Sequence, residues 1–266
     1  MLLIQCALHA EARPFIEHFR LKRRHDMHSY ACYSSDDVTL IESGTGKLNA
    51  AAATAWLGAT ITSEYPVCMN IGIAGHATRE LGTMISCQRI EDSASGKRWY
   101  PPRLIRNLPQ GENLLTLDKP GNTYPQDNAI DMEASGFLTA ATRFTPLELI
   151  QSLKIISDNQ DNPPGRFNTK QVVEMITPHI TKCVDAANEL LALRQILTGE
   201  SSKANMEPFM QQWQFSQYQQ KQLSRVLQRH IVIFGNEPDW DNDLKKIKSS
   251  KGVISELKRR INKQHP

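Results

Sequence analysis

Apolar and polar positions along the first two thirds of the chain predict strands and helices in turn. Short β-branched apolar runs that stop at a glycine or an acid are typical of buried strands. Such runs cover residues 2–8, 38–41, 67–73, 114–117 and 153–157. Apolar residues at helical spacing predict helices through Phe15 and Phe19 and over residues 48–57, 133–144 and 169–197. This alternation predicts an α/β fold: a three-layer α/β/α sandwich with a mixed, largely parallel central sheet.

The last quarter of the chain has a different pattern. Residues 200–205 are polar and predict a linker, and residues 244–261 carry apolar side chains at near-helical spacing with lysines and arginines between them. From residue 199 onward there are 12 Lys+Arg against 7 Asp+Glu, which leaves 19 against 21 before it, so the net charges are +5 and −2. We therefore expect one domain at 1–198 and a basic, mainly helical C-terminal extension at 199–266.

Two motifs near the middle of the chain carry acids at the ends of predicted elements. Asp131-Met132-Glu133-Ala134-Ser135-Gly136 places a carboxylate, Glu133, just ahead of small residues, where a helix can begin in close contact with its neighbours. Lys154-Ile155-Ile156-Ser157-Asp158-Asn159 is a strand-like run that delivers Asp158 at its carboxyl end, the edge where ligands bind in open α/β sheets. Taken singly, such acids are more often structural, as a first-turn helix acid or a helix N-cap.

Glycine-containing turns follow two of the earlier predicted strands. Ser43-Gly44-Thr45-Gly46-Lys47-Leu48-Asn49 leads into an alanine-rich helix, and Asn70-Ile71-Gly72-Ile73-Ala74-Gly75 ends the next strand. The first turn is not a P-loop, because its glycine spacing differs and Leu48 stands where Ser or Thr is needed. It is either a phosphate cradle or a tight turn between strand and helix. The first strand of the chain ends at His9-Ala10-Glu11.

In this order and spacing, the motifs resemble those of the nucleoside phosphorylase-I superfamily, and within it the nucleosidases that cleave methylthioadenosine and adenosylhomocysteine. That family has an early strand ending in a glutamate, two such glycine turns, a Met-Glu-Ala motif and a Ser-Asp motif. The resemblance covers residues 1–195. No single motif is decisive, and the resemblance rests on all five motifs in the same order and spacing.

The resemblance implies that the acids cleave a purine N-glycosidic bond. Asp158 is expected to protonate the leaving purine, Glu133 to hold the ribose hydroxyls and Glu11 to activate water. Glycoside hydrolases similarly use two carboxyl groups with different roles. Ser157 is expected to orient Asp158, and Tyr124 either stacks on the purine or anchors its loop. The residues expected to bind substrate are Glu133, Met132, Ser157, Gly75, Lys154 and Tyr124.

Two positions depart from the family pattern. Ile73 stands where the nucleosidases usually present a serine near the attacking water, and Lys154 stands where they usually have an arginine. The region after Arg89 is also shorter, which leaves the 5′ substituent open. Three functions therefore stay open: a purine nucleosidase acting on an adenosine derivative, a phosphorolytic purine nucleoside phosphorylase, and a non-catalytic nucleoside-binding or interaction protein.

Composition indicates a soluble enzyme of the cytoplasm. We expect neither a membrane span nor a signal peptide, since residues 1–4 begin a strand and no basic leader precedes them. The five cysteines are scattered and odd in number, which predicts reduced core thiols, and we expect no metal and no cofactor. The resemblance also implies a homodimer. We expect the C-terminal extension to contact a partner protein. Binding of nucleic acid is disfavoured, because the apolar helical face of the extension needs to be buried.

Overall fold

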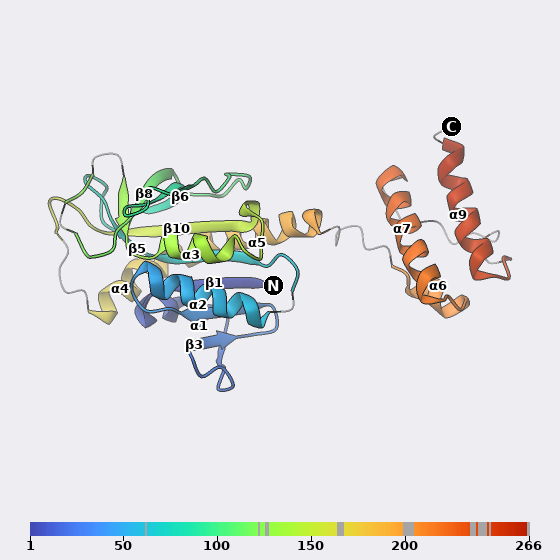
Figure 1. The fold of residues 1–266 in the computed structure, drawn as a ribbon, viewed down its shortest axis with the longest axis horizontal. Helices are drawn as coiled ribbons and strands as arrows, with labels where there is room; N and C mark the ends of the chain where they lie inside the picture. Colours follow the sequence, from blue (N-terminus) through green and yellow to red (C-terminus); the bar gives the residue numbers. More distant parts are fainter. Residues whose placement is uncertain are drawn as a thin grey trace. The chain divides into compact units, whose positions relative to one another are not determined.

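The structure is a computed structural model that describes residues 1–61, 63–121, 123–125, 128–163, 168–198, 205–234, 238, 244 and 246–264. The chain divides into two compact units, Met1–Arg194 and Gln195–Pro266. Figure 1 shows strands and helices in the first unit and helices in the second. Residues 199–204, which include most of the predicted linker, lie outside the described part.

The first unit is built around one sheet of ten strands among the described residues. The strands are β1 (Leu2–Cys6), β2 (Lys22–Arg23), β3 (Ala31–Ser34), β4 (Val38–Glu42), β5 (Val67–Gly75), β6 (Met84–Asp92), β7 (Arg98–Trp99), β8 (Gly111–Thr116), β9 (Ala129–Asp131) and β10 (Ile150–Asp158).

Parallel pairing is confined to part of this sheet. β4, β1, β5 and β10 lie next to one another and run parallel, while β3 and β2 extend the sheet beyond β4 as antiparallel strands. β6 pairs antiparallel with β10, and β8 and β9 then lead from β6 back to β5. β6 with β8 and β8 with β9 are parallel pairs as well. Among the described residues, parallel and antiparallel pairings are equally numerous, so the sheet is mixed and the expected largely parallel sheet is not confirmed.

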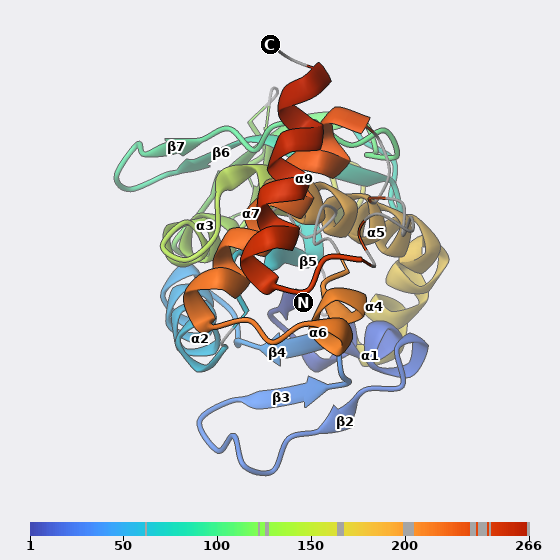
Figure 2. The same cartoon turned by 90° about the vertical axis from the view of Figure 1, so that its right-hand side faces the viewer.

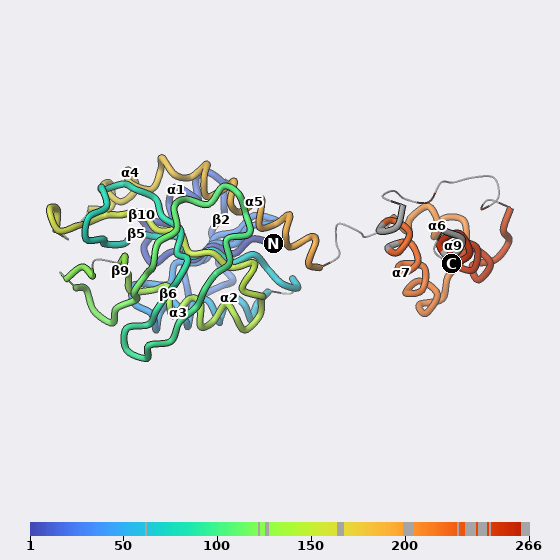
Figure 3. Tube along the Cα trace, turned by 90° about the horizontal axis from the view of Figure 1, so that it is seen from above, coloured from blue at the N-terminus to red at the C-terminus, as the bar shows by residue number. Residues whose placement is uncertain are grey.

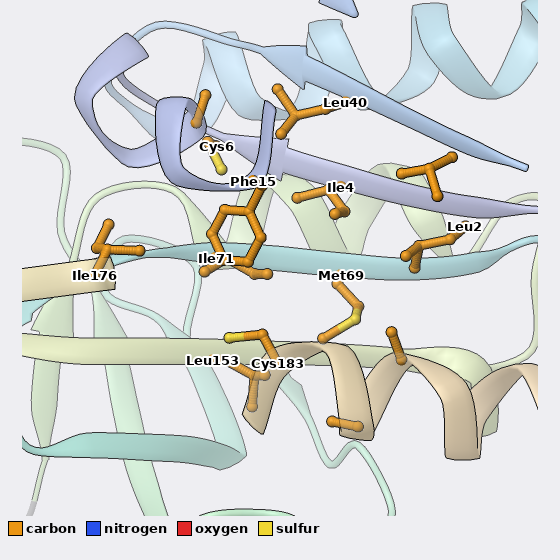
Figure 4. Packing of buried hydrophobic residues seen from close by; sticks show 14 of the residues in the cluster. Leu2, Ile4, Cys6, Phe15, Leu40, Met69, Ile71, Leu153, Ile176 and Cys183 are labelled. Carbon is orange, nitrogen blue, oxygen red and sulfur yellow. The ribbon is translucent and has the colours of Figure 1, made fainter. Parts of the chain in front are cut away.

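Helices cover both faces of the sheet. They are α1 (His9–His18), α2 (Lys47–Thr60), α3 (Ala134–Ala141), α4 (Thr169–Ile176) and α5 (Ile180–Leu197). α1, α4 and α5 pack on one face, and α2 and α3 pack on the other (Figure 2). Alternation along β1 explains this: Leu2 and Ile4 point into one apolar cluster and Leu3 into the other. Figure 4 shows the first cluster, to which α1 contributes Phe15, α5 contributes Cys183, and β5 contributes Met69 and Ile71.

Two sequence predictions of elements were incomplete. The predicted helix over residues 169–197 is two helices, because a 3-10 turn at Thr177–His179 separates α4 from α5. Pro178 lies in that turn, where its missing N–H removes an α-helical hydrogen bond. The long strand β6 was not predicted, since Gln88 and Arg89 interrupt its apolar run. Its side chains are buried at the start and mixed near the end, as expected where a strand leaves the core.

The second unit has a core of its own. Its helices are α6 (Glu207–Gln212), α7 (Gln217–Phe234) and α9 (Ser250–Gln264), and α7 and α9 pack against each other (Figure 3). Leu223 and Leu227 of α7 meet Val253 and Leu257 of α9 in one buried cluster. Trp213 closes one side of that cluster and donates a hydrogen bond from Nε1 to the carbonyl of Ile247 at 2.7 Å. None of the described helices is long and apolar enough to cross a membrane.

Candidate active site

The carboxyl ends of the parallel strands β1, β5 and β10 border a cavity of about 400 Å³. The start of α1, Thr45, Leu117 and residues 119–121 and 130–133 complete its walls. Four acids line it, and Lys119 is the one basic residue among its described lining residues. The acids are Glu11, Asp131, Glu133 and Asp158. Strongly acidic lining favours a ligand that brings hydroxyl groups or protonatable nitrogens over one that brings negative charge.

The carboxylate of Glu11 is buried at the start of α1. Its Oε2 accepts hydrogen bonds from the backbone N–H groups of Ala7 and Leu8, and its Oε1 accepts one from Ile73, each at 2.9 Å. A side chain at Gly72 would prevent this, because its Cβ would lie 2.7 Å from Oε1. Burial raises the pKa of Glu11, while Lys154 and the three N–H groups oppose the rise. Two strands thus fix the position of this acid.

Two hydroxyl groups hold the carboxylate of Asp158. Oδ1 accepts a hydrogen bond from the Ser157 hydroxyl and Oδ2 accepts one from the Tyr124 hydroxyl, both at 2.6 Å. Gly75 permits this packing, because a Cβ there would lie 2.5 Å from Oδ2 and 2.7 Å from the Tyr124 ring. Burial, followed by Asp158, raises the pKa of Tyr124, so this phenol stays protonated and can donate.

A buried ion pair lies beneath the cavity. Nζ of Lys154 is 2.9 Å from Oδ2 of Asp131, and the Lys154 side chain is 1% exposed. Asp131 also accepts hydrogen bonds from the Thr116 hydroxyl at 2.7 Å and from the N–H of Ala134 at 2.8 Å. Burial lowers the pKa of Lys154, but Asp131, Glu133 and Glu11 together raise it above its usual value. Lys154 is therefore a permanent cation that balances the surrounding acids.

Glu133 lies beside this ion pair, just before α3. Its Oε1 accepts a hydrogen bond from the N–H of Gly46 at 2.8 Å, and no described residue donates to its Oε2. Burial and then the neighbouring Asp131 raise the pKa of Glu133 to about 7, although Lys154 opposes the rise. One oxygen of this buried carboxylate is thus available to a ligand.

The glycine turn before α2 positions Glu133. Gly44 and Gly46 have φ values of 80° and 98°, in the region that favours glycine, and the N–H of Gly46 points at Glu133. Nζ of Lys47 lies 2.8 Å from Oδ2 of Asp92 and 2.8 Å from Oδ1 of Asp118. Neither the Gly46 N–H nor the Lys47 ammonium group is therefore open to a phosphate ion. This geometry favours the interpretation of the motif as a tight turn.

The tight contact predicted for the small residues after Glu133 is confirmed. A Cβ at Gly136 of α3 would lie 1.9 Å from the carbonyl oxygen of Lys47 at the start of α2. Ala134 and Ser135 are buried beside it. This contact brings the glycine turn and Glu133 together.

The structure brings most of the expected site residues to the cavity. Those lining it are Glu11, Gly75, Met132, Glu133, Ser157 and Asp158. Lys154 and Tyr124 were expected to bind substrate but are not among the lining residues. Lys154 contacts Asp131, and Tyr124 contacts Asp158.

Sequence reasoning gave no role to Asp131, Asp92 or Asp118. Asp131 had a usable signal, since it lies two residues before Glu133 in the same motif. Asp92 and Asp118 had none, because each meets Lys47 only through the tertiary fold.

No protein-family model matches the sequence, and no curated protein does. Solved structures do match the fold. The 5′-methylthioadenosine/S-adenosylhomocysteine nucleosidase of Colwellia psychrerythraea, in complex with adenine, is 18% identical, with a TM-score of 0.57 over 71% of this chain and 95% of that chain. The corresponding enzyme of Neisseria meningitidis, in complex with methylthio-immucillin-A, is 16% identical, with a TM-score of 0.55 over 69% and 96%.

A futalosine hydrolase mutant of Helicobacter pylori is 11% identical, with a TM-score of 0.55 over 71% of this chain and 98% of that chain. These enzymes belong to the nucleoside phosphorylase-I superfamily. The resemblance predicted from the sequence motifs is therefore confirmed for the fold.

Proposed function

We propose that this protein is a purine nucleosidase that hydrolyses the N-glycosidic bond of an adenosine derivative, releasing the free base and a ribosyl product. One observation carries the proposal. Three of the four acids at the cavity differ in their hydrogen-bond partners in the way that an acid, a sugar-binding group and a base require. Glu11 has three N–H donors, Glu133 has one, and Asp158 has two hydroxyl groups.

The partners of Asp158 suit a general acid. A backbone N–H can only donate, so it favours the ionised carboxylate, whereas a hydroxyl group can donate or accept. When one carboxyl oxygen of Asp158 binds a proton, the hydroxyl group beside that oxygen can turn away, while the other hydroxyl group still donates to the other oxygen. A protonated Asp158 beside a purine would donate to its ring nitrogen N7 as the glycosidic bond breaks.

Glu133 suits a group that holds ribose hydroxyls. Its Oε2 takes no hydrogen bond from the described residues, and its Oε1 is fixed by Gly46. A carboxylate can accept hydrogen bonds from two adjacent hydroxyl groups, and such bonds strengthen in a low-dielectric site. Ribose therefore fits the free side of Glu133, with Met132 alongside in the cavity wall.

Glu11 suits the base that orients and deprotonates water. Its carboxylate is held rigidly by Ala7, Leu8 and Ile73, and it still borders the cavity. Burial raises its pKa, which makes the carboxylate a stronger proton acceptor than an exposed glutamate. The serine usual in the nucleosidases at the place of Ile73 is absent, so Glu11 would act on the water without that hydroxyl group.

The cations near the cavity favour hydrolysis over phosphorolysis. Lys47 is paired with Asp92 and Asp118, and Lys154 is paired with Asp131. A phosphate nucleophile needs cations or N–H groups that are open to it. Among the described residues that line the cavity, only Lys119 brings a positive charge, so water is the better nucleophile here.

Two further features of the enzyme are proposed with it. The five cysteines are all buried and unpaired, which supports a reducing compartment such as the cytoplasm. The exposed apolar side chains of Leu8, on the cavity rim, and Leu48, in the first turn of α2, support a homodimer that buries them. Light scattering of the wild type and of Leu48→Glu tests the dimer, which we expect the substitution to weaken.

Product analysis tests the proposed reaction. The purified protein is incubated with adenosine, 5′-deoxyadenosine and 5′-methylthioadenosine, with and without inorganic phosphate. We expect free adenine and a ribosyl product at the same rate under both conditions. A sugar 1-phosphate would instead identify a phosphorylase. If the protein binds one of these compounds but cleaves none of them, it is a non-catalytic nucleoside-binding protein.

A further inference from the structure

The helical unit contains a cavity of about 220 Å³ that has no part in the proposed reaction. It lies between α7 and α9, the two helices that form most of the core of this unit. Its lining residues are Arg225, Val226 and Arg229 of α7 and Lys258 and Ile261 of α9. The three basic side chains are exposed, whereas Val226 and Ile261 are buried. The cavity thus has an apolar floor and a cationic rim.

The charges on this rim are not balanced within the described residues. No described acid forms an ion pair with Arg225, Arg229 or Lys258. The neighbouring arginines of α9 behave differently, since Arg259 and Arg260 both pair with Glu256. Arg225 and Arg229 are four residues apart on one face of α7, an arrangement in which like charges repel. An oxyanion bound between the two helices would relieve this repulsion.

The shape and chemistry of the cavity select among anionic partners. Arginine binds carboxylates and phosphates through two parallel hydrogen bonds, and Lys258 adds a point charge from the opposite helix. A single-stranded nucleic acid would also need aromatic surfaces for its bases, and none of the described residues that line this cavity is aromatic. The floor of Val226 and Ile261 instead fits an aliphatic side chain. Carboxylates on both sides of such a side chain would meet the cationic rim.

We propose that the cavity between α7 and α9 binds an acidic peptide segment of a partner protein. Carboxylates of the segment pair with Arg225, Arg229 and Lys258, and an aliphatic side chain between them packs on Val226 and Ile261. This assigns the second unit the role of a recognition module joined to the enzyme.

Fluorescence anisotropy with the full chain tests this site. The probe is a fluorescein-labelled peptide of about twelve residues in which pairs of glutamates flank a central leucine. The comparison probes are the same peptide with glutamines in place of the glutamates, and a single-stranded DNA of the same length. The test variant is Arg225→Gln combined with Arg229→Gln, and the matched control is Arg259→Gln, whose arginine pairs with Glu256. Circular dichroism checks that each variant is folded.

We expect the glutamate peptide to bind saturably and the glutamine peptide not to bind. The double variant should lose about tenfold or more in affinity, and Arg259→Gln should bind like the wild type. Absent binding of the glutamate peptide, or equal binding by the double variant, would overturn the proposal. Tighter binding of the DNA, lost in the same double variant, would overturn it in favour of a nucleic-acid site.

Discussion

At the scale of single residues, the hydrogen-bond donors around each acid matter more than the burial that the acids share. Glu11, Glu133 and Asp158 are all at most 8% exposed. Three N–H groups favour the anionic form of Glu11 and oppose the rise in its pKa that burial causes, whereas the hydroxyl groups on Asp158 can also reorient. In the proposed reaction, this difference in donor type distinguishes the base from the acid.

Asp158→Asn tests the assignment of the proton donor. The amide is close in size to the carboxylic acid and can still bond to Ser157 and Tyr124, so the fold should be retained. It cannot protonate the leaving purine, and we expect kcat to fall by about 10²–10⁴-fold. Tyr124→Phe leaves the carboxyl group of Asp158 in place, so its kcat should fall much less. Steady-state kinetics provide the comparison, and wild-type turnover by Asp158→Asn would refute the assignment.

The elevated pKa of Glu133 predicts an acid limb in the pH profile. Because this pKa is about 7, Glu133 becomes protonated below neutral pH and accepts ribose hydroxyls less well. We therefore expect kcat/KM to fall as the pH drops below about 7. Removing the nearby cation in Lys154→Met should raise the pKa of Glu133 and move the limb to higher pH.

Glu133→Gln is the control for that profile. Its residual activity should be low and should lack the limb, since glutamine does not titrate. If kcat/KM of Glu133→Gln falls at the same pH as that of the wild type, another group causes the acid limb.

At the scale of elements, the contact between α2 and α3 links the fold to the site. The missing side chain at Gly136 lets α3 touch the carbonyl of Lys47, and the preceding turn then places Gly46 against Glu133. Ion pairs from Lys47 to Asp92 and Asp118 tie this turn to the end of β6 and to the segment after β8. The position of Glu133 in the cavity therefore depends on helix packing.

Gly136→Ala should disturb both stability and binding. Its Cβ would lie 1.9 Å from the Lys47 carbonyl oxygen, so the two helices must separate. We expect a loss of about 1–3 kcal/mol in the free energy of unfolding and a higher KM. Thr139→Ala, at an exposed position of the same helix, should change stability by less than about 0.5 kcal/mol. Urea denaturation measures the free energy of unfolding of both variants. Equal losses in Gly136→Ala and Thr139→Ala would refute the packing argument.

Local pattern was sufficient to predict five of the ten described strands, the helix after Glu133 and the acids at the sheet edge. These features depend on alternation and on runs of a few residues. The break at Pro178 was missed because apolar spacing continues across it, and β6 was missed because polar residues interrupt it. The pair between Lys154 and Asp131 joins residues far apart in sequence, so no local pattern reveals it. The same holds for the hydroxyl of Tyr124 on Asp158.

At the scale of the whole molecule, the chain holds two units with separate apolar cores. All residues of the candidate active site belong to the first unit. The basic cavity belongs to the second. We therefore propose that glycosidic cleavage belongs to residues 1–198 and that partner contact belongs to the extension that follows.

A chain ending at Thr198 should stay folded and keep most of its glycosidic cleavage. The truncation leaves α5 intact through Leu197 and removes none of the residues that line the active-site cavity. Thermal unfolding and turnover, each measured beside the full chain, test this. An insoluble or inactive product would mean that the extension belongs to the catalytic core.

The origin of the oxygen on the ribosyl product tests the central claim most directly. The full chain cleaves 5′-methylthioadenosine in water enriched in heavy oxygen, with phosphate present, and mass spectrometry follows the products. Hydrolysis predicts one heavy oxygen at the anomeric carbon of a free sugar beside unlabelled adenine. An unlabelled sugar 1-phosphate, or an intact nucleoside after prolonged incubation, would contradict the account.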